Sequence, residues 1–452
     1  MRRSPRKSLV TRKVQSAPTR RRMAGRAMRR VPLRGNAYQI RGNLCPLALL
    51  ESIFTFGPRP DAGTGALGAV RLRLLHLADL HIGKRVCDFP MIGDQRHVLG
   101  RVLDLLRAGT VDALLVAGDV YDKSQPSSEA VALVDWFLQG VADTGVPAIV
   151  IPGNHDSAER VAYAGGLLSR QGIHMAPAFD GHIEPVTLAD EHGPVAVWPI
   201  PFLHPAQIRH FLPDAKTDTY TDAFRALVAS LPLDASVRNV AVAHQFVTAA
   251  GVTPERSDSE VSVGGLDNVD AGVFDPFDYV ALGHIHRAQR VGRDCVRYAG
   301  SLLKYSLLEA DYDKSAPLVT LGPKGEEPGI ELVPLTPLHD LRRIRGPLAK
   351  LVSADVVSAA DAQDYLHVIL TDQDPQVNAM ARLRDAYPNV MSIEYDNART
   401  RAAGAQADGP TDEPQEDPLQ LFSQFYEAQN GIAPTKRQLA IVEEELEGIG
   451  VM

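Results

Sequence analysis

LRLLHLADLH, residues 72 to 81, joins an apolar run to a polar end. A short apolar run of this kind is typical of a buried β-strand. The runs Ala113 to Ala117 and Ala148 to Ile151 have the same character and are also followed by polar motifs. Helical patterns separate them, at Val98 to Ala108 and Glu129 to Ala142. This alternation of strands and helices predicts an α/β core.

Later apolar runs predict more strands in the same unit: Val195 to Ile200, Val240 to Ala243, Tyr279 to Leu282 and Leu318 to Leu321. Fewer helical patterns lie between these runs than between the earlier ones. A doubly wound sheet needs a helix in each crossover, so the sparse helices favour a two-sheet α/β sandwich over residues 70 to 337.

A second, smaller unit is predicted over residues 338 to 398. A strand at Tyr365 to Leu370 precedes a helix that we expect to begin with Asp374 as N-cap and Pro375 in its first turn. A further strand at Val390 to Tyr395 completes a small α+β domain. Residues 399 to 416 are rich in Ala, Gly, Asp, Glu and Pro, which is typical of a linker.

Two helices are predicted in the final segment, residues 417 to 452. The first should begin at Asp417-Pro418, and Thr435 with Gln438 forms a capping box for the second. Apolar residues at helical spacing follow each start, and we expect them to share one face of their helix. They are Leu419, Phe422, Phe425 and Tyr426 in the first helix and Leu439, Val442 and Leu446 in the second.

Charge is distributed unevenly along the chain. Residues 1 to 69 contain 15 Lys or Arg against Glu51 and Asp61, which leaves a formal charge near −21 on the rest. The segment lacks an apolar period and predicts a disordered basic extension. It could be an upstream-extended gene model, a DNA-binding tail or a targeting segment. An acidic body binds DNA poorly without local basic residues or a basic partner.

Cysteine use and hydropathy exclude several classes of protein. Cys45, Cys87 and Cys295 are odd in number and far apart, which argues against a disulfide framework or a zinc-thiolate site and favours the cytoplasm. No apolar run approaches the roughly 18 residues that span a bilayer, so no membrane association is expected.

Five polar motifs directly follow strand-like runs: Asp79-Leu80-His81, Gly118-Asp119-Val120-Tyr121-Asp122, Gly153-Asn154-His155-Asp156, Ala243-His244 and Gly283-His284-Ile285-His286. In α/β folds the carboxyl ends of strands converge on one crevice, so all five motifs could meet there. Their nitrogen and oxygen donors suit Mn, Fe, Co or Zn. Seven candidate ligands are too many for one catalytic ion and predict two, about 3.5–4 Å apart.

The motifs, in this order, resemble the calcineurin-like metallophosphoesterase superfamily. That resemblance implies one ion held by Asp79, His81 and His286, another held by Asn154, His244 and His284, and Asp119 bridging the two. It also implies that His155 assists the leaving oxygen and that Asp122 orients His155.

A narrower resemblance is to the SbcD nuclease family. It rests on FDYVALGHIH at residues 277 to 286, YAGSLLKYS at 298 to 306 and YPNV at 387 to 390. The family implies Mn²⁺-dependent exonuclease and hairpin endonuclease activity on DNA in recombination, replication and repair. It further implies a homodimer through the nuclease domain, a DNA-capping domain at 338 to 398, and a heterotetramer-type complex with the ATPase SbcC, docked through the last helices.

Two other functions compete with this interpretation. A stand-alone phosphodiesterase or phosphatase would not need residues 338 to 452, and phosphoprotein phosphatases carry other residues where this chain has Lys123-Ser124 and Asp156. A non-catalytic scaffold for SbcC would be expected to have lost ligands. Lys84, Arg85 and Arg287 flank the motifs and are predicted to contact DNA, although solvated surface charge is their simpler explanation.

Overall fold

The computed structural model describes residues 71–249, 252–255, 268–398, 400–401, 418–430 and 433–448. The predictions for the basic extension and for most of the linker lie outside these residues. No helix in the described ranges combines the length and apolar character needed to cross a bilayer.

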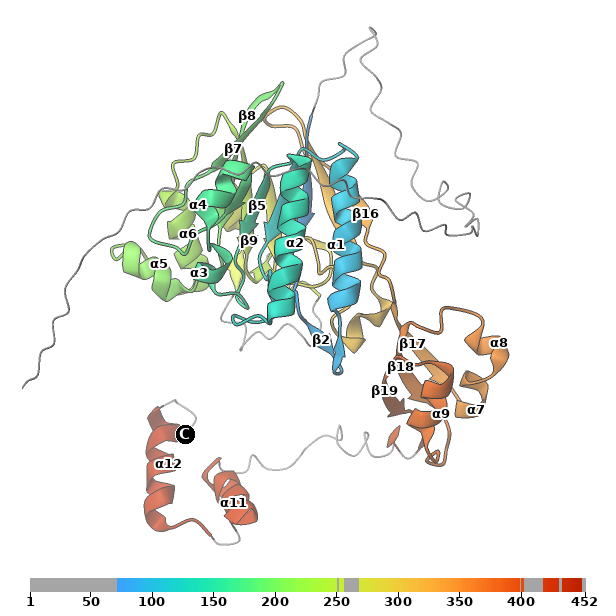
Figure 1. The fold of residues 1–452 in the computed structure, drawn as a ribbon. Helices are drawn as coiled ribbons and strands as arrows, with labels where there is room; N and C mark the ends of the chain where they lie inside the picture. The colour runs from blue at the N-terminus through green and yellow to red at the C-terminus, as the bar shows by residue number, and fades with distance from the viewer. Residues whose placement is uncertain are drawn as a thin grey trace, which may run out of the picture. The chain divides into compact units, whose positions relative to one another are not determined.

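Two six-stranded sheets form the core (Figure 1). The first has the order β16-β15-β1-β4-β5-β6, with β1 (Leu72–Leu77), β4 (Ala113–Ala117), β5 (Ala148–Ile151), β6 (Ile173–Met175), β15 (Ser315–Leu321) and β16 (Gly329–Pro334). The second has the order β13-β14-β12-β9-β8-β7, with β7 (Val186–Asp190), β8 (Gly193–Ile200), β9 (Arg238–His244), β12 (Tyr279–Gly283), β13 (Gln289–Val291) and β14 (Arg293–Tyr298). The predicted two-sheet sandwich is confirmed.

Alternating side chains of β1 enter two different hydrophobic clusters. Leu74 packs between the sheets with residues of β8, β9 and β12. Leu75 and Leu77 face the other way, toward α1 (Ile92–Arg107) and α2 (Ser128–Thr144). These two helices contact each other on this face of the first sheet (Figure 1). Because β1 is buried on both faces, its sequence is a nearly continuous apolar run.

The remaining elements of this unit are short, apart from α6. They are β2 (Arg85–Val86), β3 (Phe89–Pro90), α3 (Ala158–Val161), α4 (Gly165–Leu168), η1 (Ser169–Gln171), α5 (Pro205–Phe211), α6 (Tyr220–Ser230), β10 (Val247–Thr248), β11 (Val269–Asp270), η2 (Ala271–Phe274) and η3 (Leu307–Asp311). Phe224 and Leu227 of α6 join the cluster between the sheets.

The helix predicted at Val98 begins six residues earlier, at Ile92. Its first turn buries the polar residues Asp94 and Gln95, so the apolar pattern does not extend over it. The partners of these two side chains lie far away in sequence, at Tyr365 and Tyr305.

A smaller C-terminal unit contains β17 (Leu341–Gly346), α7 (Leu348–Leu351), α8 (Ala354–Val357), β18 (Tyr365–Leu370), α9 (Ala379–Ala386) and β19 (Val390–Tyr395). Its strands pair in the order β17-β18-β19, and both pairs are parallel. Parallel neighbours need crossover connections, which the helices provide, so this unit is α/β where α+β was predicted.

The predicted helix start at Asp374-Pro375 is wrong, because α9 begins at Ala379 after Asn378 in a left-handed conformation. The preceding segment is held by tertiary contacts. The backbone N–H of Gln376 donates to the Tyr395 hydroxyl, and Asp372 accepts from the N–H of Leu348.

The final segment forms α11 (Pro418–Asn430) and α12 (Lys436–Gly448), which contact each other. The capping box of α12 is present, with the Thr435 N–H 2.8 Å from Gln438 Oε1. Leu419, Phe422 and Tyr426 are partly buried, but Phe425 is 66% exposed and does not share their face.

Candidate metal centre

The five polar motifs meet where strands of both sheets end. Asp79 and His81 follow β1, Asp119 follows β4, Asn154 and His155 follow β5, His244 ends β9, and His284 and His286 follow β12. Backbone hydrogen bonds align the first two loops: the N–H of Asp79 donates to the Gly118 carbonyl at 3.1 Å and that of His81 to the Asp119 carbonyl at 2.8 Å.

Four of these residues have a backbone conformation that is rare outside glycine. The φ angles are 50° for Asp79, 43° for His81, 48° for Asp119 and 107° for His284. Such conformations cost free energy and persist where the surroundings fix them, often at functional sites. Each turns a side chain at a strand end toward the same crevice.

Two glycines make room for this convergence. A Cβ on Gly153 would lie 2.1 Å from Asp119 Oδ1, and one on Gly118 would lie 2.3 Å from His244 Nδ1. Both distances are far below van der Waals contact. The glycines therefore allow neighbouring loops to approach closely enough for their polar side chains to meet.

Asn154, His244 and His284 form one half of the centre. Asn154 Oδ1 lies 3.0 Å from His244 Nε2 and 3.1 Å from His284 Nδ1. His244 Nδ1 lies 2.8 Å from the Ala117 carbonyl and must donate its proton there. The lone pair of Nε2 then faces the crevice, as a metal ligand requires.

Asp79, His81 and His286 form the other half, and their ligand atoms lie within 4.8 Å of one another. His81 Nε2 is 3.1 Å from His286 Nε2. The Asp79 carboxylate accepts from the His284 N–H at 3.0 and 3.2 Å, which connects the two halves.

Asp119 lies between the halves. Its Oδ2 is 3.5 Å from His81 Nε2 and 3.4 Å from His244 Nε2, while its Oδ1 accepts from the His155 N–H at 2.9 Å. One carboxylate thus reaches a histidine in each half. This is the position that a bridging ligand would take.

Burial and charge set the protonation of these side chains. Burial lowers the pKa of His284 to about 3 and that of His81 well below its usual value, so both rings are neutral near pH 7. Burial also opposes the charged form of His244, but the adjacent Asp119 outweighs it and raises the pKa of His244 to about 9. The neutral rings offer lone pairs to a cation.

These residues fit a metal centre on their own geometry. Among the described residues, His81 Nδ1 is buried without a hydrogen-bond partner. The Nε2 atoms of His81 and His286 face each other, and the latter has a lone pair because its Nδ1 lies 3.1 Å from the Glu309 carboxylate. A cation between these nitrogens would satisfy both.

Glu309 and Lys314 support this centre, and the sequence analysis missed both. Glu309 is fully buried and its Oε2 lies 2.6 Å from Lys314 Nζ. Lys314 also donates to the His286 carbonyl at 2.8 Å. Burial raises the pKa of Glu309, but the His286 hydrogen bond and the Lys314 charge outweigh it and hold that pKa at about 2. A lone carboxylate in a short helix gives no sequence signal of this role.

Replacing Glu309 with Gln should therefore weaken metal binding at the half containing His286 by about 10- to 100-fold, the usual effect of losing such a supporting carboxylate. Calorimetric titration with Mn²⁺ measures it, with binding at the other half expected to remain. The control is Glu326→Gln, which removes an exposed ion pair with Arg71. Unchanged titration of the Glu309 variant would show that His286 needs no such support.

His155 lies beside the centre with its Nδ1 3.0 Å from the backbone carbonyl of Asp122. The prediction assigned this contact to the Asp122 side chain. That carboxylate instead pairs with Lys84 Nζ at 3.1 Å and lies 3.8 Å from His81 Nδ1. Asp122 thus orients His155 through its backbone, and Nε2 of His155 is left to meet a substrate.

Asp156 is a second residue whose role the sequence did not reveal. Its carboxylate accepts from the N–H groups of Val120, Tyr121 and Gly153, each at 2.9 Å. It therefore binds the loop after β4 to the loop after β5.

The three predicted DNA contacts each engage a protein group. Lys84 pairs with Asp122, and Arg85 donates to the Asp88 carbonyl. Arg287 pairs with Glu255, and its Cζ lies 4.6 Å from the centroid of the Tyr312 ring. Contact between these residues and DNA stays a prediction.

Two family models match this chain. Residues 72–288 match the calcineurin-like phosphoesterases, and residues 337–430 match the SbcD C-terminal model, described as the type 5 capsule protein repressor C-terminal domain. Together they cover the two units that contain the candidate centre and the parallel three-stranded sheet.

Similar curated proteins are two chains named as the SbcD component of the nuclease SbcCD. Those of Staphylococcus saprophyticus and Staphylococcus epidermidis are each 26% identical over 325 residues, which is 71% of this chain and 84% and 85% of theirs. A solved structure of a dimetal phosphatase from Danio rerio has a TM-score of 0.36 and 13% identity, over 60% of this chain and all of that one. This last likeness is too distant to indicate an activity.

Proposed function

Because this chain belongs to the SbcD group of the calcineurin-like phosphoesterases, we propose that it hydrolyses DNA phosphodiesters as the nuclease component of a complex with an SbcC-type ATPase. The observation that carries the proposal is the convergence of seven nitrogen and oxygen donors, from five strand ends, around the Asp119 carboxylate. The match over residues 337–430 argues against a stand-alone phosphatase.

The proposed ligands form two sets that share Asp119. One set is Asp79, His81 and His286, and the other is Asn154, His244 and His284. Divalent metals are implied by the family, and Mn²⁺ suits this donor set. When bound, two such ions would supply Lewis-acid activation of water and charge stabilisation. With two carboxylates in the set, about two positive charges would remain to attract a phosphodiester.

The protein's own contribution to proton transfer is His155. Its Nδ1 donates to the Asp122 carbonyl, so Nε2 is the atom that can give a proton to the leaving oxygen. The ring of His81 packs edge-on against it with 4.8 Å between centroids, which limits its rotation. Fixed orientation of this kind is what general acid catalysis requires.

An assay with end-labelled duplex and hairpin DNA tests the activity. The full chain should cleave both in Mn²⁺, faster with the SbcC-type ATPase and ATP, and should lose activity in a chelator. A phosphopeptide and a cyclic nucleotide serve as rival substrates. Efficient turnover of either, with intact DNA, would reject the nuclease assignment.

We also propose a homodimer through the nuclease domain. An apolar cavity of about 660 Å³ lies between α2 and the segment from α3 to β6, with Val131, Val134, Leu138 and Leu168 in its wall. Tyr163 nearby is 80% exposed. An apolar surface of this extent is costly in water and suits a second copy of the chain. Two copies with two ATPase subunits would make the heterotetramer, working on DNA in the cytoplasm.

The ATPase is proposed to dock on α11 and α12. These helices bury Phe422 and Tyr426 toward their own pair but leave Leu421 and Phe425 exposed. Phe425→Asp should weaken association with the ATPase by about 30-fold or more, as expected for an apolar anchor of about 2 kcal/mol. Nuclease activity of the isolated chain should be unchanged.

Surface plasmon resonance with the immobilised ATPase measures this association. Val377→Asp is the matched control, because Val377 is a similarly exposed apolar residue in the C-terminal unit, at 79%. Equal affinities of the two variants would place the docking surface elsewhere.

A further inference from the structure

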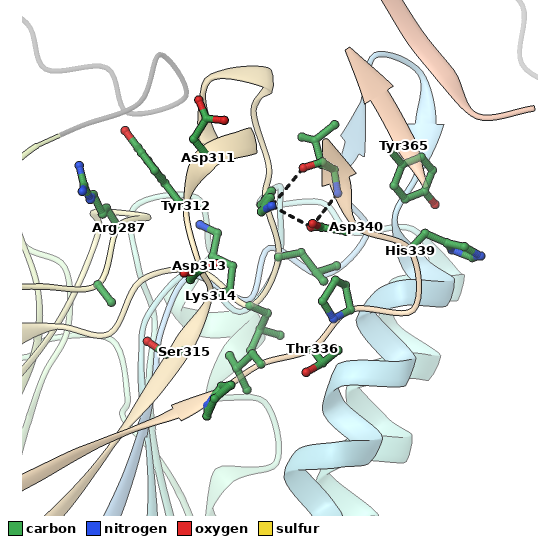
Figure 2. Close-up of a pocket in the computed structure, with 18 of the residues that line it drawn as sticks. Arg287, Asp311, Tyr312, Asp313, Lys314, Ser315, Thr336, His339, Asp340 and Tyr365 are labelled. Atoms are coloured by element: carbon green, nitrogen blue, oxygen red, sulfur yellow. Dashed lines mark hydrogen bonds and ion pairs between the residues drawn. The ribbon is translucent and has the colours of Figure 1, made fainter. Parts of the chain in front are cut away.

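The C-terminal unit meets the core along a seam marked by a cavity of about 660 Å³ (Figure 2). Arg287, Tyr312 and Lys314 line it from the core, while His339, Asp340 and Tyr365 line it from the other side. Leu341 and Tyr365 also extend the hydrophobic cluster of the first sheet across this seam.

Asp94, at the start of α1, holds the C-terminal side of the seam. Its Oδ1 accepts from the His339 N–H at 2.8 Å, and its Oδ2 accepts from the Tyr365 hydroxyl at 2.9 Å. His339 Nδ1 lies 3.2 Å from the same carboxylate. Asp94 is buried, so these bonds are shielded from water.

The next residue, Gln95, holds the loop that carries His81. Its Nε2 donates to the His81 carbonyl at 2.8 Å, and its Oε1 accepts from the Gly83 N–H at 3.0 Å. Gln95 is fully buried and also bonds the Tyr305 hydroxyl at 2.9 Å. Adjacent residues of one helical turn thus bind the C-terminal unit and the metal loop.

A second pair of adjacent residues repeats this arrangement. Lys304 Nζ donates to the Leu341 carbonyl at 3.0 Å and pairs with Asp340 Oδ1 at 2.8 Å. Tyr305 donates its hydroxyl to the Leu80 carbonyl at 2.6 Å. Both pairs therefore connect β17 and its approach to the residues flanking His81.

We propose that Asp94 and Lys304 are positioning residues that couple the placement of the C-terminal unit to the metal loop, acting through Gln95 and Tyr305. The inference rests on the proposed role of His81 as a ligand. Coupling of this kind is reciprocal: a closed seam tightens metal binding, and bound metal stabilises the seam. DNA contacts on the C-terminal unit would then adjust the metal centre without touching it.

The test uses the full-length chain and two readouts, Mn²⁺ affinity by calorimetry and backbone hydrogen exchange of β17 and β18 with and without Mn²⁺. Asp94→Ala and Lys304→Met remove the seam bonds, and Tyr365→Phe removes one hydroxyl alone. Tyr387→Phe is the matched control, because it deletes a buried hydroxyl bond to the Leu351 carbonyl inside the C-terminal unit.

We expect faster exchange of β17 in Asp94→Ala and Lys304→Met, and Mn²⁺ binding weaker by about 5-fold. Tyr365→Phe should change both in the same direction by less, and Tyr387→Phe should bind Mn²⁺ as the wild type does. Unchanged Mn²⁺ affinity with faster exchange, or unchanged exchange, would overturn the coupling. A wild-type chain that binds no Mn²⁺ would reject the metal centre itself.

Discussion

Asp119→Ala should abolish Mn²⁺-dependent DNA cleavage while the chain stays folded. The substitution removes the one carboxylate that reaches histidines of both halves, His81 and His244. Losing several kcal/mol of charge stabilisation corresponds to about 1,000- to 10,000-fold in rate. The fold should survive, because Asp119 lies outside both hydrophobic clusters of the sandwich.

Single-turnover cleavage and calorimetry with Mn²⁺ measure this loss, and thermal unfolding checks the fold. Asp104→Ala, at a surface aspartate whose side chain is 69% exposed, is the matched control and should cleave as the wild type does. A folded Asp119 variant with near-normal activity would contradict the shared-ligand assignment.

His155→Ala should separate catalysis from metal binding. We expect near-normal Mn²⁺ affinity and a cleavage rate lower by about 100- to 10,000-fold, the usual contribution of a general acid. Asp122→Asn is the informative comparison, because it keeps the backbone carbonyl that holds the His155 ring. Its effect on cleavage should be much smaller.

The outcome also decides between two roles for His155. A nitrogen of His155 clusters with ligand atoms of His81 and Asp119 closely enough to hold an ion. If Mn²⁺ affinity falls together with activity in His155→Ala, His155 is a ligand and the proton donor must be sought elsewhere.

Fully buried strands were predictable from the sequence to the residue. β1, β4 and β5 have the bounds of their apolar runs, because a strand covered on both faces has few polar positions to interrupt it. The start of α9 was not predictable. Asp374-Pro375 has the local signature of a helix start, but bonds of neighbouring residues to β19 and α7 hold this segment in another conformation.

The candidate site shows the same division between local and distant information. The residues of its motifs stand next to apolar runs, so their convergence followed from the rule that strand ends meet at one crevice. Glu309 and Gln95 carry no such signal. Gln95 meets Tyr305 across 210 positions, and only the fold brings the two together. Asp122 shows a further limit, because its contact with His155 is made by the backbone.

Anomalous diffraction from crystals grown with Mn²⁺ tests the two-metal centre most directly. The proposal predicts two manganese peaks about 3.5–4 Å apart, with Asp119 between them. Asp79, His81 and His286 should surround one peak, and Asn154, His244 and His284 the other. A single peak at full occupancy, or manganese bound away from these strand ends, would contradict it.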